Sequence, residues 1–167
     1  NEAPAPVTAE VWAEHSVWPQ DPGFSRAMAG GITTLQILPG SANLFGGRSV
    51  TLKNIPQNTY QGMKFPGAPY GLKMACGENP KRVYGGRNQA PSTRMGNVAA
   101  YRASWIRAQR YIRDWQQYEQ KMAKQTSGAE TDSNSALAAA LIKPPKRDLE
   151  LETLAGVLKG EILVHMH

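Results

Sequence analysis

The pattern of hydrophobic and polar positions along the chain predicts strands in some segments and helices in others. Runs rich in apolar residues predict buried strands over 32–38 and 71–77, and again from Ile162 onwards. Alternation of apolar and polar side chains predicts a further short strand over 49–54. The sequence therefore predicts four strands, of which three are buried.

Helices are predicted from three- and four-residue spacing and from capping residues. The longest covers about residues 92–124, where apolar and aromatic residues form one stripe and arginines fill the other faces. Asp21 and Asp148 are good N-cap residues, so each is expected to start a shorter helix; these helices end near residue 29 and at Gly160. One further helical turn is expected within the first twenty residues.

The remaining segments are predicted to be connections. Residues 39–47 form a glycine-rich loop, and the segment between the strand at 71–77 and residue 91 is also expected to be loop. Residues 125–147 change to Ser, Thr, Gly, Asn and Pro, which predicts a mobile insertion with a helical patch at 135–142.

The order of these elements predicts an α/β fold with parallel strands. In such folds, functional residues gather on loops that leave the carboxyl ends of the strands. That rule selects three places: the loop after Leu38, the turn after Cys76, and the segment His165-Met166-His167.

Length and composition limit the choice. The chain has 167 residues and a net charge of +6, and a complete (β/α)8 barrel usually takes about 250 residues. One cysteine, Cys76, excludes a disulfide framework and a multi-cysteine zinc site. No apolar run approaches the roughly 18 residues of a membrane span, so no membrane partner is expected. The chain starts at Asn1 and stops within a predicted strand, so we expect an excerpt from a longer protein.

Four residues could bind a metal ion. His165 and His167 lie two apart on a strand and share one face, and imidazole suits zinc and its neighbours; a pair of structural histidines is the alternative. Glu78 follows a strand, where it could bind metal, transfer a proton, or start a turn or helix. Lys73 lies in the middle of the same strand, which calls for an ion pair, carboxylation or an exposed tip.

Two other features have a weaker functional interpretation. The loop 40–47 could bind an anion through its backbone, but it lacks the Lys-Ser/Thr ending of a phosphate-binding loop, so a packing role is favoured. Basic residues cluster at 81–94 and along the long helix, which could suit RNA or another anion. The aromatic residues among them follow the helical period, however, so nucleic acid is disfavoured as a partner.

Five segments in order resemble metal-dependent amidohydrolases of the imidazolonepropionase-like subgroup. They are AGGITT at 29–34, LPGSANLFGG at 38–47, LKMACGENPK at 72–81, PSTRMG at 91–96 and LVHMH at 163–167. The resemblance covers most of the chain. It implies an incomplete (β/α)8 barrel within one domain, 1–167, which spans roughly the second to fifth β/α units.

The resemblance also implies a function for the intact protein. One or two zinc ions, or another divalent metal, would activate water for hydrolysis of an amide or cyclic amide C–N bond. Its implied metal ligands are His167 or, as second choice, His165, together with Glu78 or a carboxylated Lys73. Ser41, Asn43 and Arg94 would bind the small amide or peptide-like substrate.

The catalytic aspartate of the family is expected outside these residues, so the chain alone should be inactive. Its partners would be the other segments of the barrel or a second copy, in the cytoplasm or periplasm of a bacterium. A non-enzymatic α/β binding or scaffold protein is the alternative.

Overall fold

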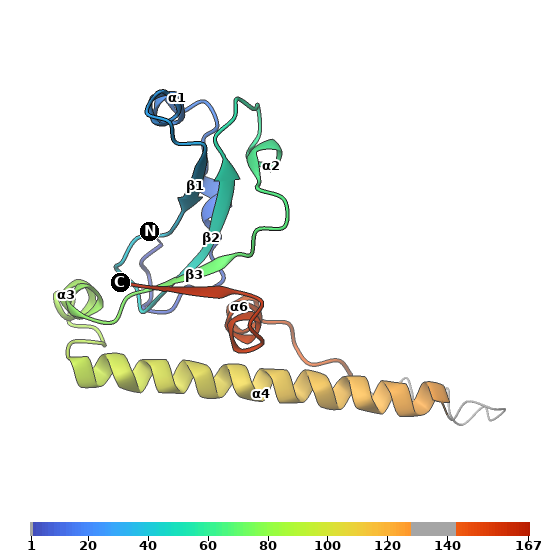
Figure 1. Ribbon diagram of the computed structural model, residues 1–167. Helices are drawn as coiled ribbons and strands as arrows, with labels where there is room; N and C mark the ends of the chain where they lie inside the picture. The colour runs from blue at the N-terminus through green and yellow to red at the C-terminus, as the bar shows by residue number, and fades with distance from the viewer. Residues whose placement is uncertain (1, 128–142) are drawn as a thin grey trace.

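A four-stranded sheet organises the structure, a computed structural model that describes residues 2–127 and 143–167 (Figure 1). The strands lie in the order β1 (Thr34–Ile37), β2 (Phe45–Lys53), β3 (Gly71–Met74) and β4 (Leu163–Met166). β2 is antiparallel to both β1 and β3, and β4 is parallel to β3. Consequently β1, β3 and β4 all run in one direction and β2 runs in the other.

The mixed sheet corrects the prediction of parallel strands. Parallel neighbours need a long crossover, and among the described strands β3 and β4 are the parallel pair, joined by a long connection with several helices. The loop between β1 and β2 is short, so these two strands form an antiparallel pair. β2 also begins inside the predicted glycine-rich loop, because Phe45 is fully buried and pairs with Met74.

Three of the helices confirm the predicted ones. They are α1 (Pro22–Ala29), α4 (Arg94–Ser127) and α6 (Leu149–Leu158). The Asp21 carboxylate accepts a hydrogen bond from the N–H of Gly23, and Asp148 accepts one from Leu151. A short 3-10 helix, η1 (Ala13–Ser16), is the helical turn expected near the start.

Two helices lie where no helix was predicted. Residues between 78 and 91 were expected to be loop, yet α3 (Glu78–Gly85) occupies much of this segment. Its first turn carries an acidic residue and a proline, both of which suit a helix N-terminus. α2 (Tyr60–Met63) is a single turn. The predicted insertion at 125–147 is helical as far as Ser127, and the predicted helical patch at 135–142 lies outside the described residues.

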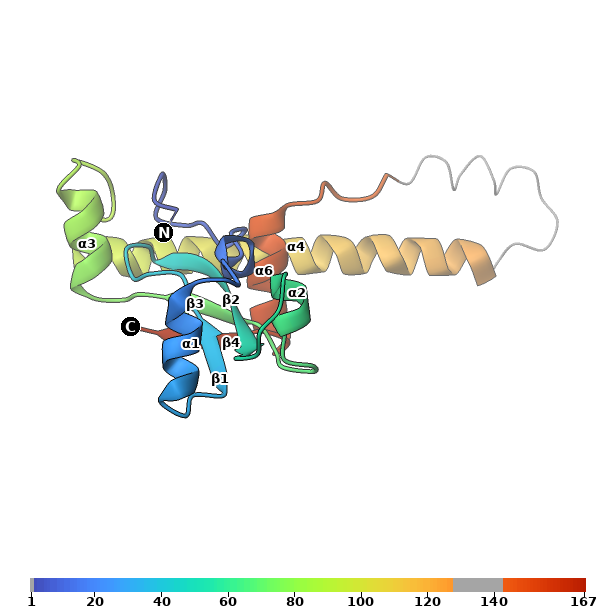
Figure 2. The same cartoon turned by 90° about the horizontal axis from the view of Figure 1, so that it is seen from above.

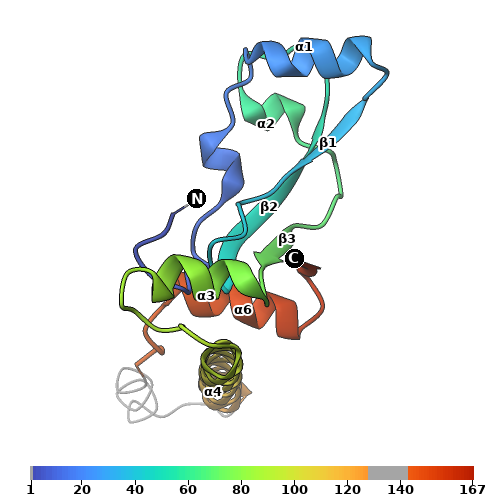
Figure 3. The ribbon, with the colours of Figure 1, turned by 90° about the vertical axis from the view of Figure 1, so that its left-hand side faces the viewer.

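Helices α3 and α6 lie between the sheet and α4, as Figures 1 and 3 show. The main core joins these layers, and the Phe45 ring packs edge-on against Tyr101 and Trp105 of α4, with ring centroids 5.4 and 5.2 Å apart. Leu72 and Met74 of β3 belong to the same cluster. Figure 2 shows that α4 extends well beyond the sheet.

The stripe of apolar and aromatic residues on α4 therefore faces inwards, as the sequence predicts, with two exceptions. Val98 and Ile106 were assigned to the buried stripe, but 55% and 52% of their surfaces are exposed. Among the helices described, α6 and α3 make most contacts with α4, and together they cover only part of its circumference. No described helix is long and apolar enough to cross a membrane.

The two faces of the sheet differ in chemistry because side chains alternate along each strand. The register places Val50, Leu52, Leu72 and Met74 on the face that packs against the helices. The opposite face, which we call the polar face, carries the intervening residues of the strands: Thr34, Gln36, Ser49, Thr51, Lys53, Gly71, Lys73, Leu163 and His165.

Exposure of the outer strands corrects a second prediction. The strands at 32–38 and from Ile162 were expected to be buried, but β1 and β4 are the two edges of the sheet. Leu163, Val164 and Met166 expose 52%, 46% and 52% of their surfaces. Within the described residues, nothing pairs with the outer edge of β4, so its apolar side chains stay open to solvent.

Candidate functional site

The three places selected from the sequence meet at the edge of the sheet that is formed by the carboxyl ends of β3 and β4. The N–H of His167 donates to the carbonyl of Met74, and the N–H of Cys76 donates to the carbonyl of His167, at 3.0 and 3.1 Å. Ala75 donates in turn to the carbonyl of Leu44 at 3.3 Å. The loop before β2, the turn after β3 and the end of β4 are thus joined by backbone hydrogen bonds.

Polar side chains from neighbouring strands meet just behind this edge. His165 of β4 is the register partner of Lys73 of β3, so the two side chains project from the same face. The Gln36 amide of β1 lies with its nitrogen 3.0 Å from Nε2 of His165 and 3.2 Å from Oγ of Ser49. Ser49 Oγ also accepts the N–H of Gly71 at 3.0 Å. We call Gln36, Ser49, Lys73 and His165 the polar row.

Gly71 provides the space in which the His165 ring lies. A Cβ atom on Gly71 would be 2.5 Å from both Nε2 of His165 and Oγ of Ser49, and it would also clash with Cδ2 of the ring. The ring therefore crosses β3 at the one residue that has no side chain. This contact places Nε2 of His165 within reach of β1, although β2 and β3 lie between β1 and β4.

Glu78 lies apart from the polar row, in the first turn of α3. Its carboxylate forms an ion pair with Lys81 at 3.0 Å, and 58% of its side chain is exposed. The hydrogen bond and charge of Lys81, with smaller contributions from Arg94 and Arg82, lower the pKa of Glu78. Glu78 is accordingly a carboxylate at neutral pH, held at the surface by basic neighbours.

The implied metal ligands are only partly brought together. His165 lies in β4 with Lys73 as its register partner, and His167 is the residue that follows the end of this strand. No group of three or more His, Cys, Asp or Glu side chains that could bind a metal ion occurs among the described residues. The described part of the chain therefore supplies some suitable ligands but does not make a complete metal site.

Asn43, one of the three predicted substrate-binding residues, lies in a buried network. It is 2% exposed, and its amide nitrogen donates to Oγ1 of Thr8 at 2.6 Å and to the carbonyl of Glu2. Its carbonyl accepts the hydroxyl of Tyr84 at 2.8 Å. This network fixes the loop before β2 against α3 and the N-terminal segment.

Ser41 and Arg94 have more open positions. Ser41 is partly buried in the loop before β2, and Arg94 is an exposed residue at the start of α4. The charge of Arg94 reaches Glu78, whose pKa it helps to lower.

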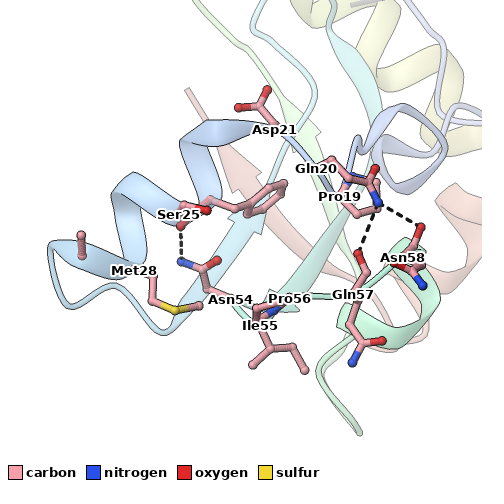
Figure 4. Close-up of a pocket in the computed structure, with 12 residues that line it drawn as sticks. Pro19, Gln20, Asp21, Ser25, Met28, Asn54, Ile55, Pro56, Gln57 and Asn58 are labelled. Atoms are coloured by element: carbon pink, nitrogen blue, oxygen red, sulfur yellow. Dashed lines mark hydrogen bonds between the residues drawn. The ribbon is translucent and has the colours of Figure 1, made fainter.

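A pocket of about 680 Å³ lies elsewhere, between α1 and residues 54–58 (Figure 4). Gln20, Asn54 and Gln57 contribute polar groups, and the amide of Gln20 donates across the rim to the carbonyl of Gln57 at 3.5 Å. Asp21 is the only acidic side chain in its lining, which contains no basic residue, and this carboxylate caps α1. The pocket therefore lacks the amine and imidazole groups of the polar row.

Gln36 and Ser49 were not identified from the sequence. Thr34 and Gln36 alternate with Leu35 and Ile37, and Ser49 begins a similar alternation in β2. This period of two is typical of a sheet with one polar face. The signal was present, but apolar residues on either side of β1 made 32–38 resemble a strand buried on both faces.

Comparisons with known proteins agree on one class of enzyme. No family model matches the chain. The amidohydrolase tasK of Hapsidospora irregularis is 31% identical over 185 aligned residues, which cover 100% of this chain and 17% of tasK. The crystal structure of an amidohydrolase from Thermotoga maritima MSB8 is 38% identical with a TM-score of 0.77, and the match covers 100% of this chain and 38% of that one.

The chain corresponds to only part of each of these two proteins. The chain spans less than a fifth of the length of tasK and well under half of the Thermotoga maritima protein. Both likenesses nevertheless extend over its whole length. Homology to these two proteins supports the amidohydrolase superfamily as the family of the chain.

Proposed function

We propose that the chain is a segment of a metal-dependent amidohydrolase that hydrolyses C–N bonds of small amides or peptide-like molecules. The segment would contribute the parallel strands β3 and β4 and the helices between them to a (β/α)8 barrel, and not the second to fifth β/α units that the resemblance implies, because β2 is antiparallel to both of its neighbours. The observation that carries the proposal is the polar row, which lies behind the edge where β3 and β4 end. Active sites of such barrels lie at the carboxyl ends of the strands. The motifs at 72–81 and 91–96 favour the imidazolonepropionase-like subgroup.

The residues present suit part of a metal site. Imidazole and carboxylate groups are common ligands of zinc and similar ions, and the remaining ligands would come from other segments of the barrel. A bound divalent ion would lower the pKa of its water and polarise the substrate carbonyl. His167 is the first choice of imidazole, because Nε2 of His165 already contacts Gln36.

Between the two carboxylate candidates, the geometry favours Lys73. Its register places it beside His165, where carboxylation of the amine would add a carboxylate to the polar row. Glu78 is held by Lys81 on an exposed helix turn. In this proposal Glu78 and Arg94 act at the rim, where they can orient a charged or polar substrate.

The test compares the intact protein with the isolated 167-residue chain. Both are assayed with added zinc against N-acyl amino acids and dipeptides, and the bound metal is measured. We expect turnover and bound metal only in the intact protein. His167→Ala and Lys73→Ala should each lower kcat/KM at least about 100-fold, as loss of a transition-state contact does.

Lys53→Ala is the matched control, because Lys53 shares the polar face but lies outside the polar row. It should retain activity. Turnover by the isolated chain would contradict the proposal that this is an incomplete site. An intact protein with neither metal nor turnover would favour a non-enzymatic scaffold, and a mass increase of one CO₂ on Lys73 would identify the carboxylated residue.

A further inference from the structure

One series of hydrogen bonds in the polar row fixes the orientation of His165. It runs from the N–H of Gly71 to Oγ of Ser49, and from Ser49 through the Gln36 amide to Nε2 of His165, with successive distances of 3.0, 3.2 and 3.0 Å. Ser49 is 1% exposed, so its hydroxyl is a fixed anchor. Residues of β1, β2 and β3 thus form one hydrogen-bonded series that ends at Nε2 of the imidazole.

The direction of these hydrogen bonds decides which ring nitrogen carries the proton. The Gln36 amide nitrogen has two N–H groups, and it donates to Ser49 Oγ at 3.2 Å. Its other N–H is available to Nε2 of His165, which lies 3.0 Å from the same amide nitrogen. A neutral imidazole has one N–H and one acceptor nitrogen, so a donor at Nε2 requires the proton to be on Nδ1.

We propose that Gln36 is a positioning residue that holds His165 in the Nδ1–H tautomer and occupies Nε2. His165 then presents a directed N–H donor on the polar face, and His167 is left as the imidazole that binds metal at this edge. The assignment of metal to His167 rests on the proposed function, whereas the tautomer depends only on the sheet.

The opposite amide orientation makes the proposal falsifiable. If the Gln36 carbonyl oxygen faced His165, it would accept an N–H from Nε2, and the other tautomer would follow. Ser49 would then donate its hydroxyl to the same oxygen. The two orientations predict opposite protonation of the same ring, which spectroscopy distinguishes directly.

The experiment measures ¹⁵N chemical shifts of the ring nitrogens in the 167-residue chain labelled at histidine. It is done at one pH at which histidine side chains are ordinarily neutral. His165→Phe identifies the resonances of residue 165 among the three histidines. We expect an unprotonated Nε2 and a protonated Nδ1 at His165. A protonated Nε2, or an average of both forms, would overturn the proposal.

Variants separate a positioning role from a structural one. Gln36→Glu keeps an acceptor but removes the donor, so His165 should switch to the Nε2–H form. Gln36→Leu removes both and should give a mixture of tautomers. Thr51→Val is the matched control: Thr51 is the register partner of Gln36 on β2, and its substitution should leave the tautomer unchanged. Identical shifts in wild type and Gln36→Glu would contradict the proposal.

Addition of zinc to the intact protein, labelled in the same way, distinguishes the two proposals. We expect His167 resonances to change and those of His165 to keep the Nδ1–H pattern. Binding of zinc through Nε2 of His165 would overturn this inference but not the metal-dependent function. A fixed Nδ1–H tautomer in an intact protein that never binds metal would refute the proposed function and leave the tautomer established.

Discussion

Gly71 is the single residue on which the geometry of the polar row depends most. Its replacement by alanine puts a methyl group 2.5 Å from Nε2 of His165 and from Oγ of Ser49. We expect Gly71→Ala to destabilise the fold by about 1–3 kcal/mol, the usual cost of overpacking. The His165 contact with Gln36 should be lost as well. Urea unfolding measures the first effect, and the ring ¹⁵N shifts measure the second.

Gly30→Ala is the matched control for this prediction. Gly30 has ordinary backbone angles, with φ of −83°, and its nearest neighbour to a new Cβ would be 3.4 Å away. The stability of Gly30→Ala should stay close to that of the wild type. Equal stabilities of the two variants would show that the His165 ring does not need the space above Gly71.

Lys64 and Glu14 form the best-shielded ion pair among the described residues. Their atoms are 2.7 Å apart, Glu14 is 4% exposed, and Tyr70 contacts both side chains. Removal of one member of a buried pair costs about 3–5 kcal/mol. Because 34% of the Lys64 side chain is exposed, we expect Lys64→Met to cost about 1–3 kcal/mol in chemical denaturation.

The pH dependence of that loss follows from the pKa of Lys64. Burial lowers this pKa, but the hydrogen bonds to Glu14 and Tyr70 and the charge of Glu14 outweigh burial, so the net pKa is raised. A raised folded pKa means that the pair stabilises fully below about pH 10.4, the ordinary lysine value, and less as the pH rises through the folded value. Wild type and Lys64→Met should therefore converge in stability at strongly alkaline pH.

Lys81→Met is the control for this ion pair, because the Lys81 partner Glu78 is exposed. It should leave the free energy of unfolding unchanged within error. A loss as large as that of Lys64→Met would mean that burial does not decide the strength of these pairs.

At the scale of elements, α6 depends on its N-cap. The Asp148 carboxylate accepts the N–H of Leu151 at 3.0 Å, and α6 places Thr153 where its hydroxyl accepts a hydrogen bond from Arg48 of β2 at 2.8 Å. Asp148→Ala should cost about 1 kcal/mol of stability, as removal of a helix cap usually does. Asp148→Asn keeps the acceptor and should lose much less. Thermal unfolding followed by circular dichroism compares the two variants.

Several elements could be predicted from local sequence, and the exceptions have a physical cause. Capping residues located α1 and α6, and the aromatic spacing located α4. Periodicity cannot show how wide a covered face is, so Val98 of α4 and Val164 of β4 were expected to be buried. Exposure of both depends on which elements pack beside them.

Sites are harder to predict than elements because they depend on register. Histidine spacing predicted His165 and His167 on one face of a strand, but β4 ends at Met166 and contains only His165 of the two. The contact of His165 with Gln36 depends on the register of three strand pairs, and a bulge between Phe45 and Gly47 shifts the pairing of β2 with β3 without a signal in the hydrophobic pattern. Gln36 could therefore be assigned to the polar row only from the sheet.

At the scale of the whole molecule, the outer edge of β4 is an open surface. Leu163, Val164 and Met166 are exposed beside it, and no described segment pairs with this edge. Unpaired apolar edge strands associate with one another. We expect the isolated chain to associate as its concentration rises, which light scattering during size-exclusion chromatography measures.

Val164→Lys tests whether β4 is responsible. A charge on an edge strand opposes pairing, so this variant should stay monomeric at concentrations at which the wild type associates. Val98→Lys on α4 introduces the same charge at a similarly exposed apolar position and should not reduce association. Equal effects of both variants would indicate general repulsion between charged molecules.

The order of strands in the sheet has a consequence for how the protein folds. Gln36 and His165 are 129 positions apart, whereas β1 and β2 are separated by a short loop. Contacts between distant residues lose the entropy of loop closure before any favourable contact forms. Pairing of β1, β2 and β3 is therefore expected before β4 joins. The polar row is then completed by the last strand to arrive, and a nearly folded molecule has no site until that step has finished.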